Sequence, residues 1–194
     1  MKRWMAIFAA ISISFLNSTA FADTYKVDPD HTTVGFKIRH LLGYVNGSFD
    51  QFDGTLDFDP DNLELSKTSG TIQTASINTR VKERDNHLRS KDFFDAEKYP
   101  QITFKSTKVL EATPAGGKLE GLLSIHGVEK PVVLDVEIHG VANDPWGNTR
   151  AAFTATTKIN RKDFGLTWNQ ALETGKLLVD EEVLITIDSE GIKQ

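Results

Sequence analysis

Apolar residues recur at every second position in many short segments of this chain, and this alternation constrains the fold more than any other feature. In "TVGFKIRH", Val34, Phe36 and Ile38 lie on one side of an extended chain, with Lys37 and Arg39 on the other. A period of two is typical of a β-strand with one buried face. The same pattern occurs at residues 101–109, 131–140, 152–160 and 182–191.

Further strands are predicted at residues 47–59, 68–79 and 118–126, which brings the expected number to eight. The segments between them carry turn sequences, "DPDN", "PAGG", "HGVEKP" and "DPWGN", in which Pro fixes φ and Gly accepts positive φ. Such short connections join antiparallel neighbours, whereas parallel strands need long crossovers. The chain therefore predicts an antiparallel meander.

Eight twisted strands with one apolar face can hide that face in a sandwich or in a closed barrel. The longest segment without strand character is residues 80–100, and a shorter one covers residues 169–176. One short helix cannot cover an open sheet of that size. We therefore predict an all-β fold, an eight-stranded antiparallel barrel with its apolar face inward and one short charged helix between strands.

The first 22 residues have the layout of a secretory signal. Two basic residues precede the apolar run "MAIFAAISISFL", and "AFA" supplies a small-x-small cleavage pattern. The run is shorter than the ~20 apolar residues that span a bilayer, which favours a cleaved signal over an uncleaved anchor. We expect a signal peptide at 1–22, one domain at 23–194 and a periplasmic location.

Charge and cysteine content exclude several classes of function. Without Lys2 and Arg3 of the signal, the net charge is −7, which disfavours binding to nucleic acid or to an anionic membrane surface by charge alone. The chain has no cysteine, so it has neither thiolate chemistry nor disulfides, and its core alone must stabilise it.

The segment "RDNHLRSKDFF" is a strongly charged helical stretch that ends on Phe93 and Phe94. In one interpretation, Asp85 and Arg89 form a surface ion pair and the two phenylalanines close the end of the barrel. In the other, the phenylalanines face a lumen and cationic side chains such as Arg84 lie at its rim. The sequence supports both interpretations equally.

Catalytic and metal sites are not predicted. Asp85, His87 and Ser90 suggest a triad, but residues two apart on a helix point to different sides, so Asp85 cannot orient His87. The five histidines lack the spacing of a metal site. Gly116-Gly117 lacks the context of a phosphate loop and predicts a hairpin turn.

The sequence resembles the YceI family of secreted, lipocalin-like proteins over essentially all of residues 23–194. Charged, aromatic and turn residues agree in the same order across separate segments, most sharply in "ERDNHLRSKDFFDAEKYP". The segments are "VDPDHTTVGFKIRH" (27–40), "FDGTLDFD" (52–59), "SINTRVKERDNHLRSKDFFDAEKYPQITFKST" (76–107), "GLLSIHGVEKPVVLDV" (121–136), "DPWGNTRAAF" (144–153) and "INRKDFGLTWN" (159–169).

The resemblance implies an extended barrel that holds a long amphiphile, typically a polyisoprenoid of quinone-like or polyprenyl type, with no catalytic residue, cofactor or metal. It is compatible with a membrane donor or acceptor protein as a partner and leaves the oligomeric state open. Strand alternation supplies the expected ligand-binding residues: Val34, Phe36, Ile38, Phe52, Ile72, Phe93, Phe94, Ile102, Phe104, Phe153 and Phe164, with Arg84 and Arg89 for a polar head.

Two other functions stay open at this point. One is a lipid-processing enzyme, and the other is a periplasmic stress-response interaction protein without a small ligand. A lumen filled by the side chains of Phe36, Phe49, Phe52, Phe104 and Phe153 would favour the interaction protein, because periodicity cannot distinguish a filled barrel from a hollow one.

Overall fold

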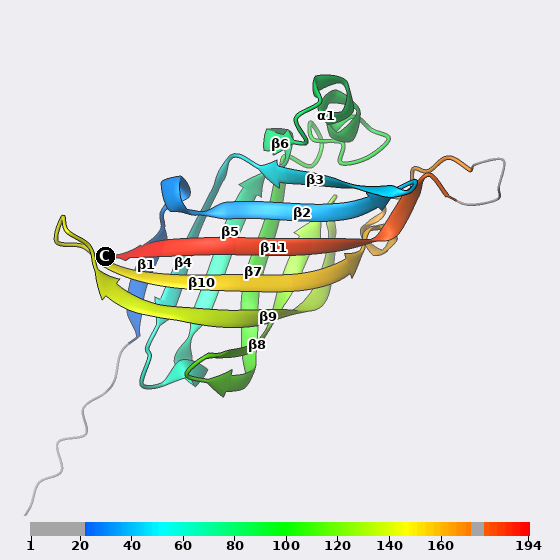
Figure 1. Cartoon of the computed structure of the whole chain (residues 1–194). Helices are drawn as coiled ribbons and strands as arrows, with labels where there is room; N and C mark the ends of the chain where they lie inside the picture. Colours follow the sequence, from blue (N-terminus) through cyan, green and yellow to red (C-terminus); the bar gives the residue numbers. More distant parts are fainter. Residues whose placement is uncertain (1–21, 172–176) are drawn as a thin grey trace, which may run out of the picture.

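The computed structural model describes residues 22–171 and 177–194, which form one antiparallel sheet and a short helix (Figure 1). The strands are β1 (Asp23–Val27), β2 (Thr33–His40), β3 (Gly43–Phe49), β4 (Phe52–Phe58), β5 (Lys67–Gln73), β6 (Ile77–Asn78), β7 (Gln101–Thr113), β8 (Gly116–Ile125), β9 (Val128–Asn143), β10 (Thr149–Asn160) and β11 (Val179–Lys193). The helices are α1 (Lys82–Arg89) and the 3-10 turns η1 (Pro29–His31), η2 (Leu63–Leu65), η3 (Thr74–Ser76) and η4 (Arg161–Phe164).

The sheet closes into a barrel of eight strands, which confirms the predicted fold. Its order is β1-β4-β5-β7-β8-β9-β10-β11, and β11 pairs back onto β1. The ladder continues from β11 to β2, then to β3 and to the two-residue β6. Every pairing is antiparallel, as the short turns between strands predict.

The first two barrel strands are each bent in the middle. β1 and β2 are halves of one strand separated by η1, and β3 and β4 are halves of the next, separated by Asp50 and Gln51. The predicted strand at residues 47–59 therefore starts earlier, at Gly43, and is interrupted. The bends let these strands pass from the front wall, with β2, β3 and β9 to β11, to the rear wall, with β4, β5, β7 and β8 (Figure 1).

A charged cluster fastens the seam where the last strand meets the first. Arg150 Nη1 donates to Asp28 Oδ2 at 2.6 Å and to Glu190 Oε2 at 3.2 Å, and its Nε donates to Asp144 Oδ2 at 2.9 Å. The hydrogen bond from Arg150 lowers the pKa of Asp28 despite its burial, and Arg150 likewise holds the pKa of Asp144 well below its usual range. These contacts join the start of η1, the turn between β9 and β10, and strands β10 and β11 at one end of the barrel.

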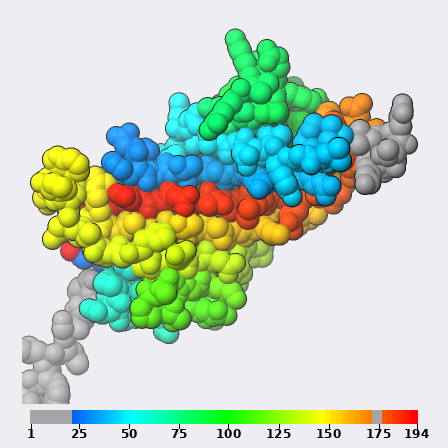
Figure 2. All heavy atoms as spheres, in the orientation of Figure 1, coloured from blue at the N-terminus to red at the C-terminus, as the bar shows by residue number. Residues whose placement is uncertain are grey.

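Helix α1 sits over the upper edge of β3 and β6, where its charged side chains bind the preceding chain (Figures 1 and 2). Asp85 is only 7% exposed and accepts hydrogen bonds from Thr79 N at 2.8 Å and Thr79 Oγ1 at 2.5 Å. The interpretation of Asp85 as half of a surface ion pair with Arg89 was therefore wrong. The backbone N–H of Thr79 needs an acceptor in this buried position, and the carboxylate supplies it.

The proposed signal peptide lies almost wholly outside the described residues, so its cleavage stays a prediction. Among the residues that the structure describes, no helix is long and apolar enough to cross a membrane.

Candidate ligand-binding cavity

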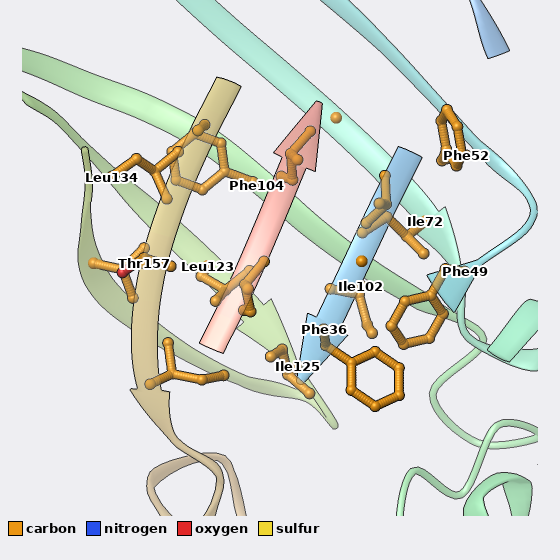
Figure 3. A pocket seen from close by; sticks show the side chains of 18 of the residues that line it. Phe36, Phe49, Phe52, Ile72, Ile102, Phe104, Leu123, Ile125, Leu134 and Thr157 are labelled. Atoms are coloured by element: carbon orange, nitrogen blue, oxygen red, sulfur yellow. The ribbon is translucent and has the colours of Figure 1, made fainter. Parts of the chain in front are cut away.

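The barrel is hollow. A cavity of about 670 Å³ lies between its front and rear walls and extends from α1, at Arg84 and His87, to the β7–β8 hairpin, at Glu111 and Lys118. Figure 3 shows Phe36, Phe52, Phe104, Leu123 and Leu134 projecting into it from different strands. Because the inward positions of each strand are mostly Ile, Leu, Val and Phe, the alternation that builds the barrel also makes the cavity apolar.

Most residues that the sequence predicted for a ligand site lie together on this cavity. Eleven of the thirteen line it: Val34, Phe36, Ile38, Phe52, Ile72, Arg84, Phe93, Phe94, Ile102, Phe104 and Phe153. The inward residues predicted on β9, β10 and β11, such as Leu134, Thr157 and Ile185, line it as well. The predicted alternation therefore has the correct phase on both walls.

Phe164 and Arg89 are not among the lining residues. Phe164 is 2% exposed and belongs to the buried core, since it lies in η4 beyond the end of β10. Arg89 donates from Nε to the carbonyl of Ala75 at 2.6 Å and from Nη2 to that of Ile77 at 2.7 Å. These bonds fasten α1 to the chain before it and direct the guanidinium away from the lumen.

Arg84 does line the cavity, but two of its three guanidinium nitrogens are bonded to Thr79. Its Nε donates to Thr79 Oγ1 at 2.7 Å and its Nη2 to the Thr79 carbonyl at 2.8 Å. Asp85 and Arg84 therefore both bind Thr79 and hold α1 against the end of the barrel. The structural interpretation of this segment and the interpretation as a rim of the lumen are each correct in part.

An aromatic cluster occupies the α1 end of the cavity. The rings of His87, Phe93 and Trp168 lie 5.0 to 5.1 Å apart, centroid to centroid, and all three residues line the cavity. Phe94 packs edge-on against Phe49, with the centroids 6.0 Å apart. The two phenylalanines that end the charged segment therefore both close the barrel and face its lumen.

Trp168 and Arg161 are among the lining residues that sequence reasoning missed. Arg161 is 3% exposed and continues the inward alternation of β10 beyond Ile159, in step with Ala155 and Thr157. A charged residue in phase with an apolar face was the signal that could have identified it. Trp168 carried no periodic signal, because it lies in a segment without regular structure.

The polar residues of α1 are engaged in structural contacts. The Ser90 hydroxyl donates to the backbone carbonyl of His87 at 2.8 Å, His87 Nε2 lies 2.9 Å from Asp92 Oδ2, and Asp85 accepts from Thr79. These partners differ from the hydrogen-bond chain of a catalytic triad, in which serine, histidine and aspartate bond to one another. In the described part of the chain, no group of three or more His, Asp or Glu side chains is placed to hold a metal ion.

Fold and cavity together define a class of protein: a single-domain, lipocalin-like antiparallel barrel built around an apolar cavity. The model of the YceI-like domain matches residues 25–191, and the chain belongs to the YceI family. The Protein YceI sequences of Salmonella arizonae and Salmonella newport are each 40% identical to it over 199 aligned residues, which cover 100% of both chains.

Solved structures share the barrel. Burkholderia cenocepacia BcnA is 26% identical with a TM-score of 0.73, covering 84% of this chain and 98% of that one. The Campylobacter jejuni YceI protein is 31% identical with a TM-score of 0.69, covering 100% and 99%. A polyisoprenoid binding domain from Saccharophagus degradans, implicated in plant cell wall breakdown, covers 88% and 98% with a TM-score of 0.65; at 15% identity this likeness shows the fold alone.

Proposed function

We propose that this chain is an exported binding protein that holds one long apolar lipid, of the polyisoprenoid class, inside the barrel. The observation that carries the proposal is the apolar cavity of about 670 Å³. Its volume lies within the ~300–1,000 Å³ typical of small-molecule sites. A barrel stabilised only by packing would be expected to fill this space with its own side chains.

The physical reason for such a cavity is the insolubility of the guest. Burying each CH₂-sized increment of a hydrocarbon chain is worth ~0.8 kcal/mol, so a lumen that covers many increments retains a lipid firmly. The long, mostly apolar wall fits a tail better than it fits a compact polar metabolite. One protein of the same fold is described as a polyisoprenoid binding domain, and we propose the same ligand class here, quinone-like or polyprenyl.

A carrier explains the site better than the two other functions considered. An enzyme needs reactive groups that converge on one point, whereas His87 and Asp85 are bonded to Asp92 and Thr79. An interaction protein without a ligand has no use for a hollow interior. We therefore propose binding without catalysis, in the periplasm, with a membrane or a membrane protein as donor and acceptor of the lipid.

Extraction of the purified protein tests the proposal. Organic solvent should release a long, mostly hydrocarbon molecule in near-stoichiometric amount, detected by mass spectrometry, because mass action protects a tightly held guest during purification. The stripped protein should melt at a lower temperature and recover when polyprenyl lipid is added back. An empty extract, together with a melting temperature that polyprenyl lipids do not change, would overturn the proposal in favour of the interaction protein.

A further inference from the structure

The cavity wall contains one buried cation whose hydrogen-bonding capacity is incompletely used. Arg161 donates from Nε to the carbonyl of Asp180 at 2.8 Å and from Nη1 to the carbonyl of Leu166. Its Nη2 is buried and has no hydrogen-bond partner among the described residues. Buried polar groups are nearly always hydrogen-bonded, so an orphaned N–H₂ group in a binding cavity requires an explanation.

Within residues 22–171 and 177–194, the charge of Arg161 also has no ion-pair partner. Among the described residues, no carboxylate forms a salt bridge with it; its neighbour Glu181 pairs instead with Lys162, at 2.6 Å. Burial lowers the pKa of the Arg161 guanidinium, and the more distant charges of Glu181 and Asp180 oppose that shift only in part. A buried charge is normally paired, because removing it from water is unfavourable unless an opposite charge compensates it.

Arg161 lines the cavity together with Leu166, Trp168 and Val179, at the end of the barrel where β10 finishes and β11 begins. The other lining arginine, Arg84, has its Nε and Nη2 bonded to Thr79. Of these two lining arginines, only Arg161 has a buried guanidinium nitrogen without a hydrogen-bond partner among the described residues.

We propose that Arg161 binds the polar head of the lipid and that this head carries an oxyanion, a phosphate or a carboxylate. Nη2 donates to the oxyanion, and the ligand supplies the negative charge that the protein leaves out. The tail then extends through the apolar lumen toward Phe104 and Leu134. This assignment rests on the proposed lipid-binding function and replaces the predicted role of Arg84 and Arg89 in holding the head.

An oxyanion satisfies the site better than a neutral carbonyl or hydroxyl does. All of these oxygens can accept the Nη2 hydrogen bond, but only the oxyanion also compensates the desolvated positive charge. Charge-assisted hydrogen bonds between a guanidinium and phosphate or carboxylate are about twice as strong as neutral ones. We therefore expect the protein to distinguish lipids with identical tails by the charge of their heads.

The experiment compares two lipids with one tail, geranylgeranyl monophosphate and geranylgeraniol, with palmitate as a third ligand. Binding to the delipidated protein is followed by the fluorescence of Trp168 in a Trp146→Phe background, since Trp146 is 80% exposed in a distant turn. The phosphate should bind roughly ten- to a hundredfold more tightly than the alcohol. Strong binding of palmitate would extend the site to carboxylates, and weak binding would restrict it to phosphates.

Arg161→Met removes the charge and keeps an apolar side chain of similar length. It should abolish the preference for the phosphate and leave binding of geranylgeraniol within about twofold of wild type. The matched control is Lys162→Met, which removes the exposed cation next in sequence and should keep the preference. A phosphate preference that persists in Arg161→Met would overturn the proposal.

A variant that fails to fold is recognised separately. If Arg161→Met binds neither lipid, Arg161→Lys is the variant that tests the assignment, because it keeps the positive charge in the cavity wall. A retained preference for the phosphate then supports the assignment, and equal binding of the two lipids overturns it. Failure of the wild-type protein to bind any of the lipids would instead count against the proposed function. Equal binding of phosphate and alcohol by wild type leaves lipid binding intact and refutes the role of Arg161.

Discussion

The phenyl ring of Phe36 occupies the space that a side chain at Gly47 would take. The two residues face each other across β2 and β3, and a Cβ atom at Gly47 would lie 2.4 Å from Cζ of Phe36. The ring can lie against the wall here only because its partner is glycine. Although Phe36 is large and points inward, its ring lies over Gly47 and does not fill the lumen. The Phe36–Gly47 pair therefore helps to set the width of the cavity.

Gly47→Ala should narrow the lumen. The new methyl group meets the far end of the Phe36 ring, which must swing toward the cavity, and overpacking of this kind costs about 1–3 kcal/mol. We expect a lower melting temperature and a severalfold loss of copurifying lipid, measured by mass spectrometry of the extract. Adding Phe36→Leu should recover much of the lipid, since the shorter side chain leaves room for the methyl group.

Gly43→Ala on the same strand is the control, because a Cβ at Gly43 has no atom within 4 Å. It should retain the full lipid content. Equal lipid content in the Gly47 and Gly43 variants would show that the Phe36–Gly47 pair does not determine the space available to the ligand.

Phe104→Asp should disrupt the lumen, whereas Lys105→Asp should be nearly silent. Phe104 lines the cavity and Lys105 is exposed on the opposite face of β7. A carboxylate without a partner in an apolar cavity costs several kcal/mol unless it is protonated or hydrated. The melting temperature and the lipid content should therefore fall in Phe104→Asp only. Equal effects at the two positions would refute the inward assignment of Phe104.

The Arg150 cluster should make stability depend on acidic pH. The pKa values of Asp28 and Asp144 are lowered in the folded protein, so their stabilisation is present above the unfolded value of about 4 and is lost as the pH falls through the folded values. Arg150→Met should lower the melting temperature at pH 7, and its difference from wild type should shrink below about pH 4. A difference that is independent of pH would contradict this origin.

Lys158→Met serves as the comparison for Arg150→Met. Lys158 and Glu182 form an ion pair at 2.8 Å in which both side chains are about 60% exposed, and such pairs contribute little to stability. The variant should melt close to wild type at both pH values.

The exported protein should begin at Asp23. Intact-mass measurement of periplasmic material should give the mass of residues 23–194, because cleavage after "AFA" removes the signal. Retention of residues 1–22 would contradict both the signal peptide and the periplasmic location.

The barrel could be predicted from the sequence because its strands each carry a one-sided apolar pattern. That pattern identified Ile102 and Phe104 as inward residues, and the turn sequences gave antiparallel neighbours. The strand prediction did not include the bends at η1 and at Asp50. The inward positions change phase across each bend, from Val27 to Val34 and from Phe49 to Phe52, and this change was the signal that could have located them.

The site was predictable in part. Periodicity identifies the face of a residue, but it does not say whether a ring crosses the lumen or lies over a glycine, so a hollow barrel could not be derived. Arg89 was assigned to the rim because it is a cation near Phe93, yet its guanidinium binds two backbone carbonyls that only the fold brings near. Arg161 was missed because a charged residue directly after the last apolar position of a strand usually marks the end of that strand, although Arg161 is in phase with the inward positions of β10.

The pairing of β1 with β11 closes the barrel, so the cavity forms only when the last strand of the chain has folded onto the first. Asp23 and Lys193, 170 positions apart, meet across this pairing. Until the last strand docks, the earlier strands present unpaired edges and an uncovered apolar face, which is the condition in which β-proteins aggregate. A topology dominated by such distant contacts folds slowly. The incomplete chain is therefore the form most exposed to aggregation, and only the closed barrel can enclose a ligand.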